Sequence, residues 1–168
     1  IALKKAICIK SLIGKAEIFM EIGAGTGELG RILLEMGVAK KYIIIDIPPA
    51  LAVSQYLMTS SFTAKNIAGF SKQRMDIEDF HSKRCLFLLP SQTNLIEKAD
   101  VGINTGSFQE MTRMMVSEYA LLSKRVGLKN FISINTREPH TANLDQCIDE
   151  KFYISNFEPE FEVSSKFS

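Results

Sequence analysis

Short apolar runs alternate with amphipathic segments along most of the chain. Runs dominated by β-branched and other apolar residues predict buried strands at 17–22, 42–47, 85–89, 99–104 and 128–134. Apolar positions at helical spacing predict helices at 1–14, 28–36, 50–58 and 108–126. Strands that alternate with helices are typical of an α/β fold, so we expect a doubly wound, mostly parallel sheet with helices on both faces.

Two segments do not follow this alternation. Residues 59–83 are polar and mixed, and we assign no element to them. The tail over 152–167 alternates apolar with charged residues, which is compatible with an antiparallel C-terminal strand or an edge hairpin. An antiparallel strand at the C-terminus therefore stays open as an addition to the parallel sheet.

Composition limits the class of protein. With 168 residues, 46% of them hydrophobic, the chain has enough apolar residues for a single domain over 1–168 with its own core. The 20 Lys and Arg nearly balance the 19 Asp and Glu, which gives no argument for nucleic acid or an anionic membrane as a partner. No apolar run approaches the roughly 20 residues that span a bilayer. The first residues already have a helical pattern, so we expect a fragment of a longer chain.

The cysteines are three in number and widely spaced, without a CxxC pair. This pattern argues against a disulfide scaffold or a zinc site and favours a reducing compartment, so we expect a cytoplasmic protein. No tight cluster of Asp, Glu and His marks a metal site, and none is predicted. The sequence does not predict the oligomeric state.

The segment over residues 16–30, AEIFMEIGAGTGELG, is the most informative for function. An apolar strand ends in an acidic residue, three glycines alternate, and a helical pattern follows. Glycines at this spacing let the backbone approach a ligand closely, and the following helix start offers unpaired N–H groups. A nucleotide-like ligand is therefore expected here, bound by the loop residues Gly23, Ala24, Gly25, Thr26 and Gly27.

The frame of the glycines distinguishes between nucleotides. Residues 25–30 satisfy the dinucleotide pattern GxGxxG, but Gly23 and Ala24 then separate the strand from its first glycine. A frame that begins at Gly23 places Glu28 where the third glycine belongs, beside a pyrophosphate that would repel it. The spacing Glu21-x-Gly23-x-Gly25-x-Gly27 instead resembles the first motif of the class I S-adenosylmethionine (SAM) methyltransferases, whose fold is Rossmann-like.

This resemblance implies SAM as the cofactor. SAM carries an ammonium and a sulfonium but no phosphate, so Glu21 at the strand end would favour it. Asp46, at the end of the next strand, can accept hydrogen bonds from both ribose hydroxyls. Because the same acid would serve NAD, an NAD-binding domain remains an alternative. The remaining predicted cofactor contacts are Ile47, Ser91, Gln92 and Asn104.

Two further segments resemble a family of sugar O-methyltransferases found with bacterial surface-polysaccharide genes. They are Ile45–Leu51 (IDIPPAL), followed by Tyr56 and Leu57, and Asn104–Met111 (NTGSFQEM). The resemblance covers roughly residues 15–137, and members of the family are usually longer. It implies an acceptor that is a small-molecule sugar or glycan, methylated on a hydroxyl group.

Candidate acceptor and catalytic residues follow the last two predicted strands. Ser107, Gln109 and Arg137 are predicted to bind the acceptor, since hydroxyl-rich ligands need several fixed donors and acceptors. A general base would help a sugar hydroxyl to react, and the candidates are His140, Glu110 and Glu138. Ser107 and Glu110 can also form a capping box at the start of the helix predicted over 108–126, and the two roles are compatible.

Two other functions remain open at this point. The chain could be a methyltransferase for a different acceptor, or a degenerate SAM-binding module without catalysis. The glycine frame and Asp46 predict the cofactor, whereas the acceptor depends on the resemblance of residues 104–111.

Overall fold

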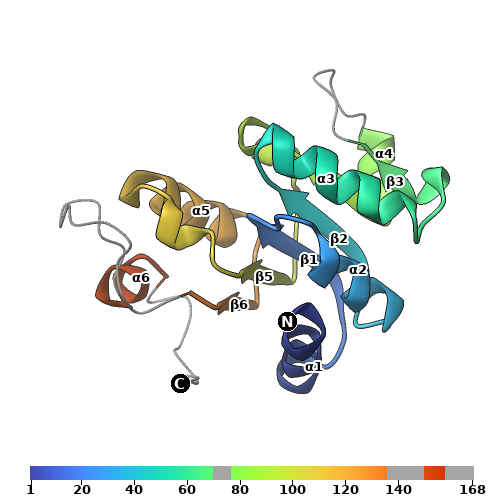
Figure 1. Ribbon diagram of the computed structural model, residues 1–168. Helices are drawn as coiled ribbons and strands as arrows, with labels where there is room; N and C mark the ends of the chain where they lie inside the picture. The colour runs from blue at the N-terminus through green and yellow to red at the C-terminus, as the bar shows by residue number, and fades with distance from the viewer. Residues whose placement is uncertain (70–76, 136–149, 158–168) are drawn as a thin grey trace.

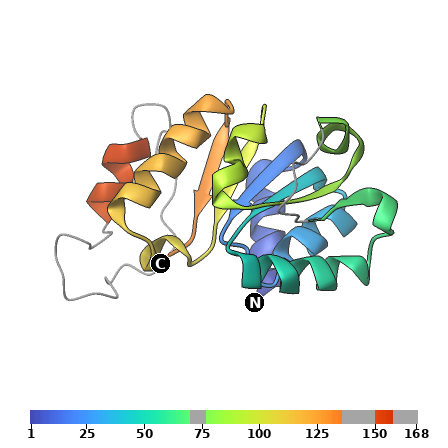
Figure 2. The same ribbon diagram turned by 90° about the horizontal axis from the view of Figure 1, so that it is seen from above.

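A six-stranded sheet forms the centre of the molecule and carries helices on both faces (Figures 1 and 2). The computed structural model describes residues 1–69, 77–135 and 150–157. The strand order is β3-β4-β2-β1-β5-β6, and every pairing is parallel, as the sequence predicts. The strands are β1 Ala16–Ile22, β2 Ala39–Ile45, β3 Ile67–Ala68, β4 Cys85–Leu88, β5 Val101–Asn104 and β6 Asn130–Ser133.

The helices pack in two layers, one on each face of the sheet. Alternate residues of each strand point to opposite faces, so Phe19 and Met20 of β1 belong to different apolar clusters. On the face of Phe19 lie α1 Ala2–Ile13, α2 Glu28–Glu35 and α3 Pro48–Thr59. On the face of Met20 lie α4 Ile77–Ser82, α5 Arg113–Arg125 and α6 Glu150–Phe157. No described helix is long and apolar enough to cross a membrane.

The register of the sheet brings the ends of neighbouring strands to one edge. Ile22 at the end of β1 pairs with Ile45 of β2 and with Asn104 of β5. The N–H of Gly23 donates to the carbonyl of Ile45 at 2.8 Å, which continues the pairing into the glycine loop. The strand order reverses between β1 and β5, and ligands of open parallel sheets bind at such a point.

The helix predicted over 108–126 is interrupted in the structure. A short 3₁₀ helix, η3 Phe108–Glu110, comes first, and α5 begins only at Arg113. The side chain of Thr112 caps α5 by accepting the N–H of Met115 at 3.3 Å. The predicted capping box of Ser107 and Glu110 is therefore wrong, because the Ser107 hydroxyl donates to a carbonyl of β1 instead.

The C-terminal strand prediction is also wrong over the part of the tail that the structure describes. Residues 150–157 form α6, where Phe157 packs against Phe131 of β6 and Phe108, with ring centroids 4.5 and 6.4 Å apart. Residues 158–168 lie outside the described residues. In the unassigned segment 59–83 the structure places η1 Ala64–Asn66, β3 and α4.

Candidate functional site

The glycine loop joins β1 to α2 at the carboxyl edge of the sheet. Its three glycines have φ of 69° at Gly23, 58° at Gly25 and 72° at Gly27. These left-handed conformations favour glycine over any residue with a side chain. The loop closes with a hydrogen bond of 3.0 Å from the N–H of Gly27 to the carbonyl of Ala24. Gly25 and Thr26 are exposed at its tip, where a ligand can approach the backbone.

Two of the glycines also allow close packing. A Cβ at Gly23 would overlap the hydroxyl of Ser107, which follows β5. A Cβ at Gly27 would lie 2.9 Å from the Cβ of Ser54 on α3. The loop is therefore held between the segment after β5 and helix α3.

Asp46 follows β2 and binds the glycine loop from the side. Its Oδ2 accepts the N–H of Gly25 at 2.9 Å, and its Oδ1 accepts the N–H of Ile47 at 2.8 Å. Each carboxylate oxygen has a second lone pair, so Asp46 can still accept two hydroxyl donors. Its partly exposed side chain lies beside Ile47, whose own side chain is 57% exposed.

Glu21 lies on β1 directly before the loop and is 1% exposed. The hydroxyl of Tyr42, on β2, donates to its Oε2 at 2.9 Å, and Tyr42 stacks on Phe19. Burial, and to a smaller extent the charge of Asp46, raise the pKa of Glu21 to about 7. Hydrogen bonds from Tyr42 and Thr105 and the charge of Lys5 act in the opposite direction.

The charge of the site follows from these residues. Glu21 and Asp46 are close enough for their charges to interact, and residues 21–30 contain no basic side chain. Arg31, the first base after the loop, pairs with Glu35 at 2.9 Å and with Glu28 at 3.7 Å. The loop thus presents backbone N–H groups in an acidic setting, which favours a cationic ligand over a pyrophosphate.

Asn104 and Ser107 hold the base of the glycine loop. Asn104 is fully buried, and its Nδ2 donates to the carbonyl of Ile22 at 2.9 Å and to Ser107 Oγ at 2.5 Å. The Ser107 hydroxyl donates to the same carbonyl at 3.0 Å. The Oδ1 of Asn104 accepts the N–H of Phe108 at 3.3 Å. Both side chains therefore stabilise the loop through hydrogen bonds within the protein. Their contacts with a ligand remain predictions.

Other predicted site residues reach the same edge of the sheet. Ser91 and Gln92 follow β4 in the 3₁₀ helix η2 Pro90–Leu95, where Oε1 of Gln92 accepts the N–H of Leu89 at 2.8 Å. Gln109 and Glu110 follow β5 in η3, and Glu110 is exposed. Arg137, Glu138 and His140 lie outside the described residues.

Sequence reasoning missed two polar residues that contact the residues of this site. Tyr42 sits within an apolar run, so its pattern predicts a core residue, and only the register of β1 and β2 brings it to Glu21. Asn135 follows β6, and its Nδ2 donates to Oδ1 of Asn104 at 2.9 Å. Asn135 directly follows the strand predicted over 128–134, and a polar residue at that place was the available signal.

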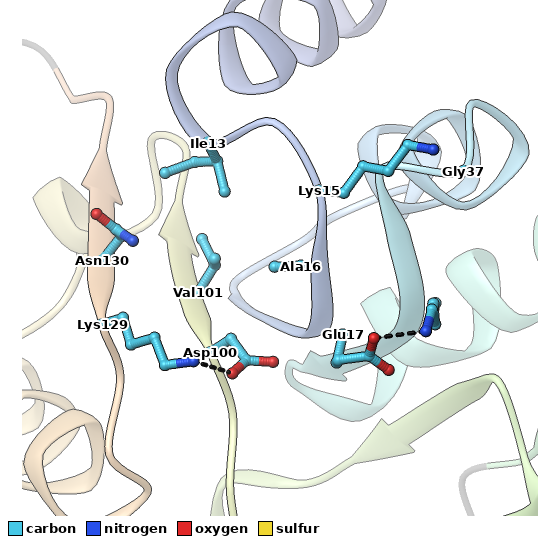
Figure 3. A pocket seen from close by; sticks show the side chains of 10 residues that line it. Ile13, Lys15, Ala16, Glu17, Gly37, Asp100, Val101, Lys129 and Asn130 are labelled. Atoms are coloured by element: carbon cyan, nitrogen blue, oxygen red, sulfur yellow. Dashed lines mark ion pairs between the residues drawn. The ribbon is translucent and has the colours of Figure 1, made fainter.

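A cavity of about 290 Å³ lies at the opposite, amino edge of the sheet (Figure 3). Within it Lys40 pairs with Glu17 at 2.5 Å and Lys129 with Asp100 at 3.2 Å. A second cavity of similar volume lies between Thr26 at the glycine loop and Leu57 on α3. No group of three or more His, Cys, Asp and Glu that could hold a metal ion occurs in the described part of the chain.

No family model matches the sequence, and neither does any curated protein. Solved structures do match the fold. The methyltransferase domain of bacterial CtHen1 has a TM-score of 0.59 and 13% identity, over 92% of this chain and 78% of that one. The glycopeptide N-methyltransferase MtfA, in complex with sinefungin, has a TM-score of 0.53 and 14% identity, over 76% of this chain and 46% of that one.

The mycolic acid cyclopropane synthase CmaA1, in complex with SAH and CTAB, has a TM-score of 0.53 and 14% identity, over 74% of this chain. The chain has the class I methyltransferase fold. It spans less than two thirds of the length of several of the proteins whose fold it shares, including 38% of CmaA1 and 46% of MtfA. These proteins act on different acceptors, so the likeness identifies the fold and leaves the acceptor open.

Proposed function

We propose that this chain binds SAM at the glycine loop and transfers its methyl group to a hydroxyl of a sugar or of a sugar-containing intermediate in the cytoplasm. The observation that supports SAM as the cofactor is the pair of carboxyl groups at the loop: Glu21 is buried below the loop, and Asp46 lies beside it. A ligand with an ammonium and a ribose but no phosphate matches this setting. The structures of MtfA with sinefungin and of CmaA1 with SAH support it by their shared fold.

Different residues of the site would bind different parts of SAM. The carboxylate of Asp46 would accept hydrogen bonds from the ribose hydroxyls. The exposed backbone at Gly25 and Thr26 would lie in close contact with the ligand. Glu21 would act from beneath as the counter-charge of the ammonium. SAM supplies a methyl group already activated by its sulfonium, so alignment of the acceptor can provide much of the catalysis.

The sugar acceptor is proposed on the resemblance of residues 104–111 and on the polar groups after β5 and β6. Gln109 and Glu110 follow β5 at the same edge as the glycine loop. Tritiated SAM, offered with the methyl glycosides of rhamnose, fucose and mannose, tests this part. Transfer to a glycoside hydroxyl supports the sugar acceptor, and transfer to none of them contradicts it.

Calorimetry on Asp46→Ala tests the cofactor site. A charged hydrogen bond contributes roughly 1.5–3 kcal/mol, so the affinity for SAM should fall about 10-fold to 100-fold. Asp100→Ala is the matched control, because Oδ2 of Asp100 also accepts a backbone N–H, that of Ile18 at 2.9 Å, but at the opposite edge. Binding of NAD in place of SAM, or unchanged affinity in a folded Asp46→Ala, would contradict the assignment.

A further inference from the structure

Among the residues that the structure describes, the side chain of Asn135 has one polar atom without a partner. Its Nδ2 donates to Oδ1 of Asn104 at 2.9 Å and to Oγ of Ser133 at 2.8 Å. Its Oδ1 is buried and has no hydrogen-bond partner in the described structure. A buried acceptor without a partner costs about 1–3 kcal/mol, so it calls for a physical reason.

The orientation of this amide follows from backbone groups. The carbonyl of Ile22 can only accept and the N–H of Phe108 can only donate, which fixes which end of the Asn104 amide faces each of them. Oδ1 of Asn104 therefore also faces Asn135, which must present its own NH₂ group. Exchanging the oxygen and nitrogen of Asn135 would place two acceptors against each other, so the unpartnered atom is the oxygen.

The position of Asn135 in the sheet indicates which ligand could donate a hydrogen bond to its Oδ1. The N–H of Ile134 donates to the carbonyl of Asn104 at 2.9 Å, so Asn135 lies just beyond the carboxyl end of β6. Asp46 follows β2, which is three strand spacings, or roughly 14 Å, away along the sheet. The ribose, bound at Asp46, and Asn135 therefore lie at opposite ends of the site. Because the cofactor occupies the end at β2, the ligand expected at the β6 end is the acceptor.

We propose that Oδ1 of Asn135 accepts a hydrogen bond from a hydroxyl of the methyl acceptor, which makes Asn135 a substrate-binding residue; this rests on the proposed function. The amide oxygen is neutral and takes no proton at ordinary pH, so it positions the hydroxyl and leaves proton removal to another group. The acceptor must then carry a hydrogen-bond donor at or beside the methylated atom. A hydroxyl meets this condition and a carbon–carbon double bond does not.

Asn135→Leu tests the proposal, because it removes the oxygen at similar size. Ser133→Ala is the matched control, since it removes a partner of Nδ2 and keeps the oxygen. With tritiated SAM and the methyl glycosides, Asn135→Leu should lose at least 10-fold in kcat/KM, whereas its SAM affinity by calorimetry and its Tm should stay close to wild type. A kcat/KM within twofold of wild type in a folded Asn135→Leu would overturn the proposal.

The remaining outcomes separate this proposal from the proposed function. If the affinity for SAM falls with the kcat/KM, the donor belongs to the cofactor and the acceptor assignment is wrong. In the complex with S-adenosylhomocysteine, methyl α-L-rhamnopyranoside should shift the side-chain carbonyl resonance of Asn135. SAM binding with neither methyl transfer nor this shift overturns the role of Asn135, and failure to bind SAM overturns the proposed function itself.

Discussion

At the residue scale, the ionisation of Glu21 couples stability to pH. Its pKa rises from an ordinary 4.5 to about 7 because the carboxyl is buried, so between these pH values the folded state holds more protons than the unfolded one. The free energy of unfolding therefore falls as pH rises through this range, by about 3 kcal/mol for this residue. Burial is the largest cause of the shift, and Tyr42, Lys5, Asp46 and Thr105 modify its size.

Glu21→Gln should remove this dependence. Denaturant unfolding at pH 5 and pH 8 should show that wild type loses about 3 kcal/mol more than the variant as pH rises. Glu17→Gln is the control, because Glu17 is exposed on the same strand and pairs with Lys40. Equal slopes for wild type and Glu21→Gln would contradict the assignment of the titration to Glu21.

Sequence alone could anticipate part of the chemistry at this scale. Asp46 and the loop glycines follow from spacing, because strand ends and sharp turns demand specific residue types. The contact of Tyr42 with Glu21 depends on the pairing register of two strands, which a single sequence does not specify. The hydrogen-bond network of Asn104, Ser107 and Asn135 joins segments that are separated in the chain, so it could not be predicted from the sequence either.

At the scale of elements, the glycine loop is fixed by two separate constraints. Gly23 and Gly25 share a left-handed φ, but only at Gly23 would a Cβ also meet a neighbour, Ser107. Gly25→Ala should therefore cost about 1–2 kcal/mol from backbone strain alone. Gly23→Ala should cost roughly 1–3 kcal/mol more because of the overlap. Unfolding free energies of the two variants check this, and equal losses would contradict the packing role of Gly23.

Most strands were predictable from their apolar runs, although boundaries moved by a few residues, as at β2, which starts at Ala39. The break before α5 was not predictable, because Thr112 offers a local cap that competes with a continuous helical pattern. Helix α6 was missed because Phe157 alternates with polar neighbours, yet tertiary packing against Phe108 and Phe131 decides its conformation.

At the scale of the whole molecule, ligand binding should stabilise the fold. A ligand that binds only the folded state at 100 times its Kd adds about 2.7 kcal/mol. For a domain of this size that raises Tm by roughly 5–10 °C. Thermal unfolding with S-adenosylhomocysteine should show this rise, and NAD at the same concentration is the control. A rise with NAD and none with S-adenosylhomocysteine would reverse the choice of cofactor.

The strand order has a consequence for how such a protein can change. From β1 the chain adds β2, β4 and β3 on one side, and only after residue 100 does it add β5 and β6 on the other. On the proposed function, the first stretch serves the cofactor and the second the acceptor. One recombination event near Glu97 would then exchange acceptor recognition as a unit. Such chimeras would acquire new acceptors, and they would keep the cofactor site if the incoming half preserves Asn104 and Ser107, which hold the base of the glycine loop.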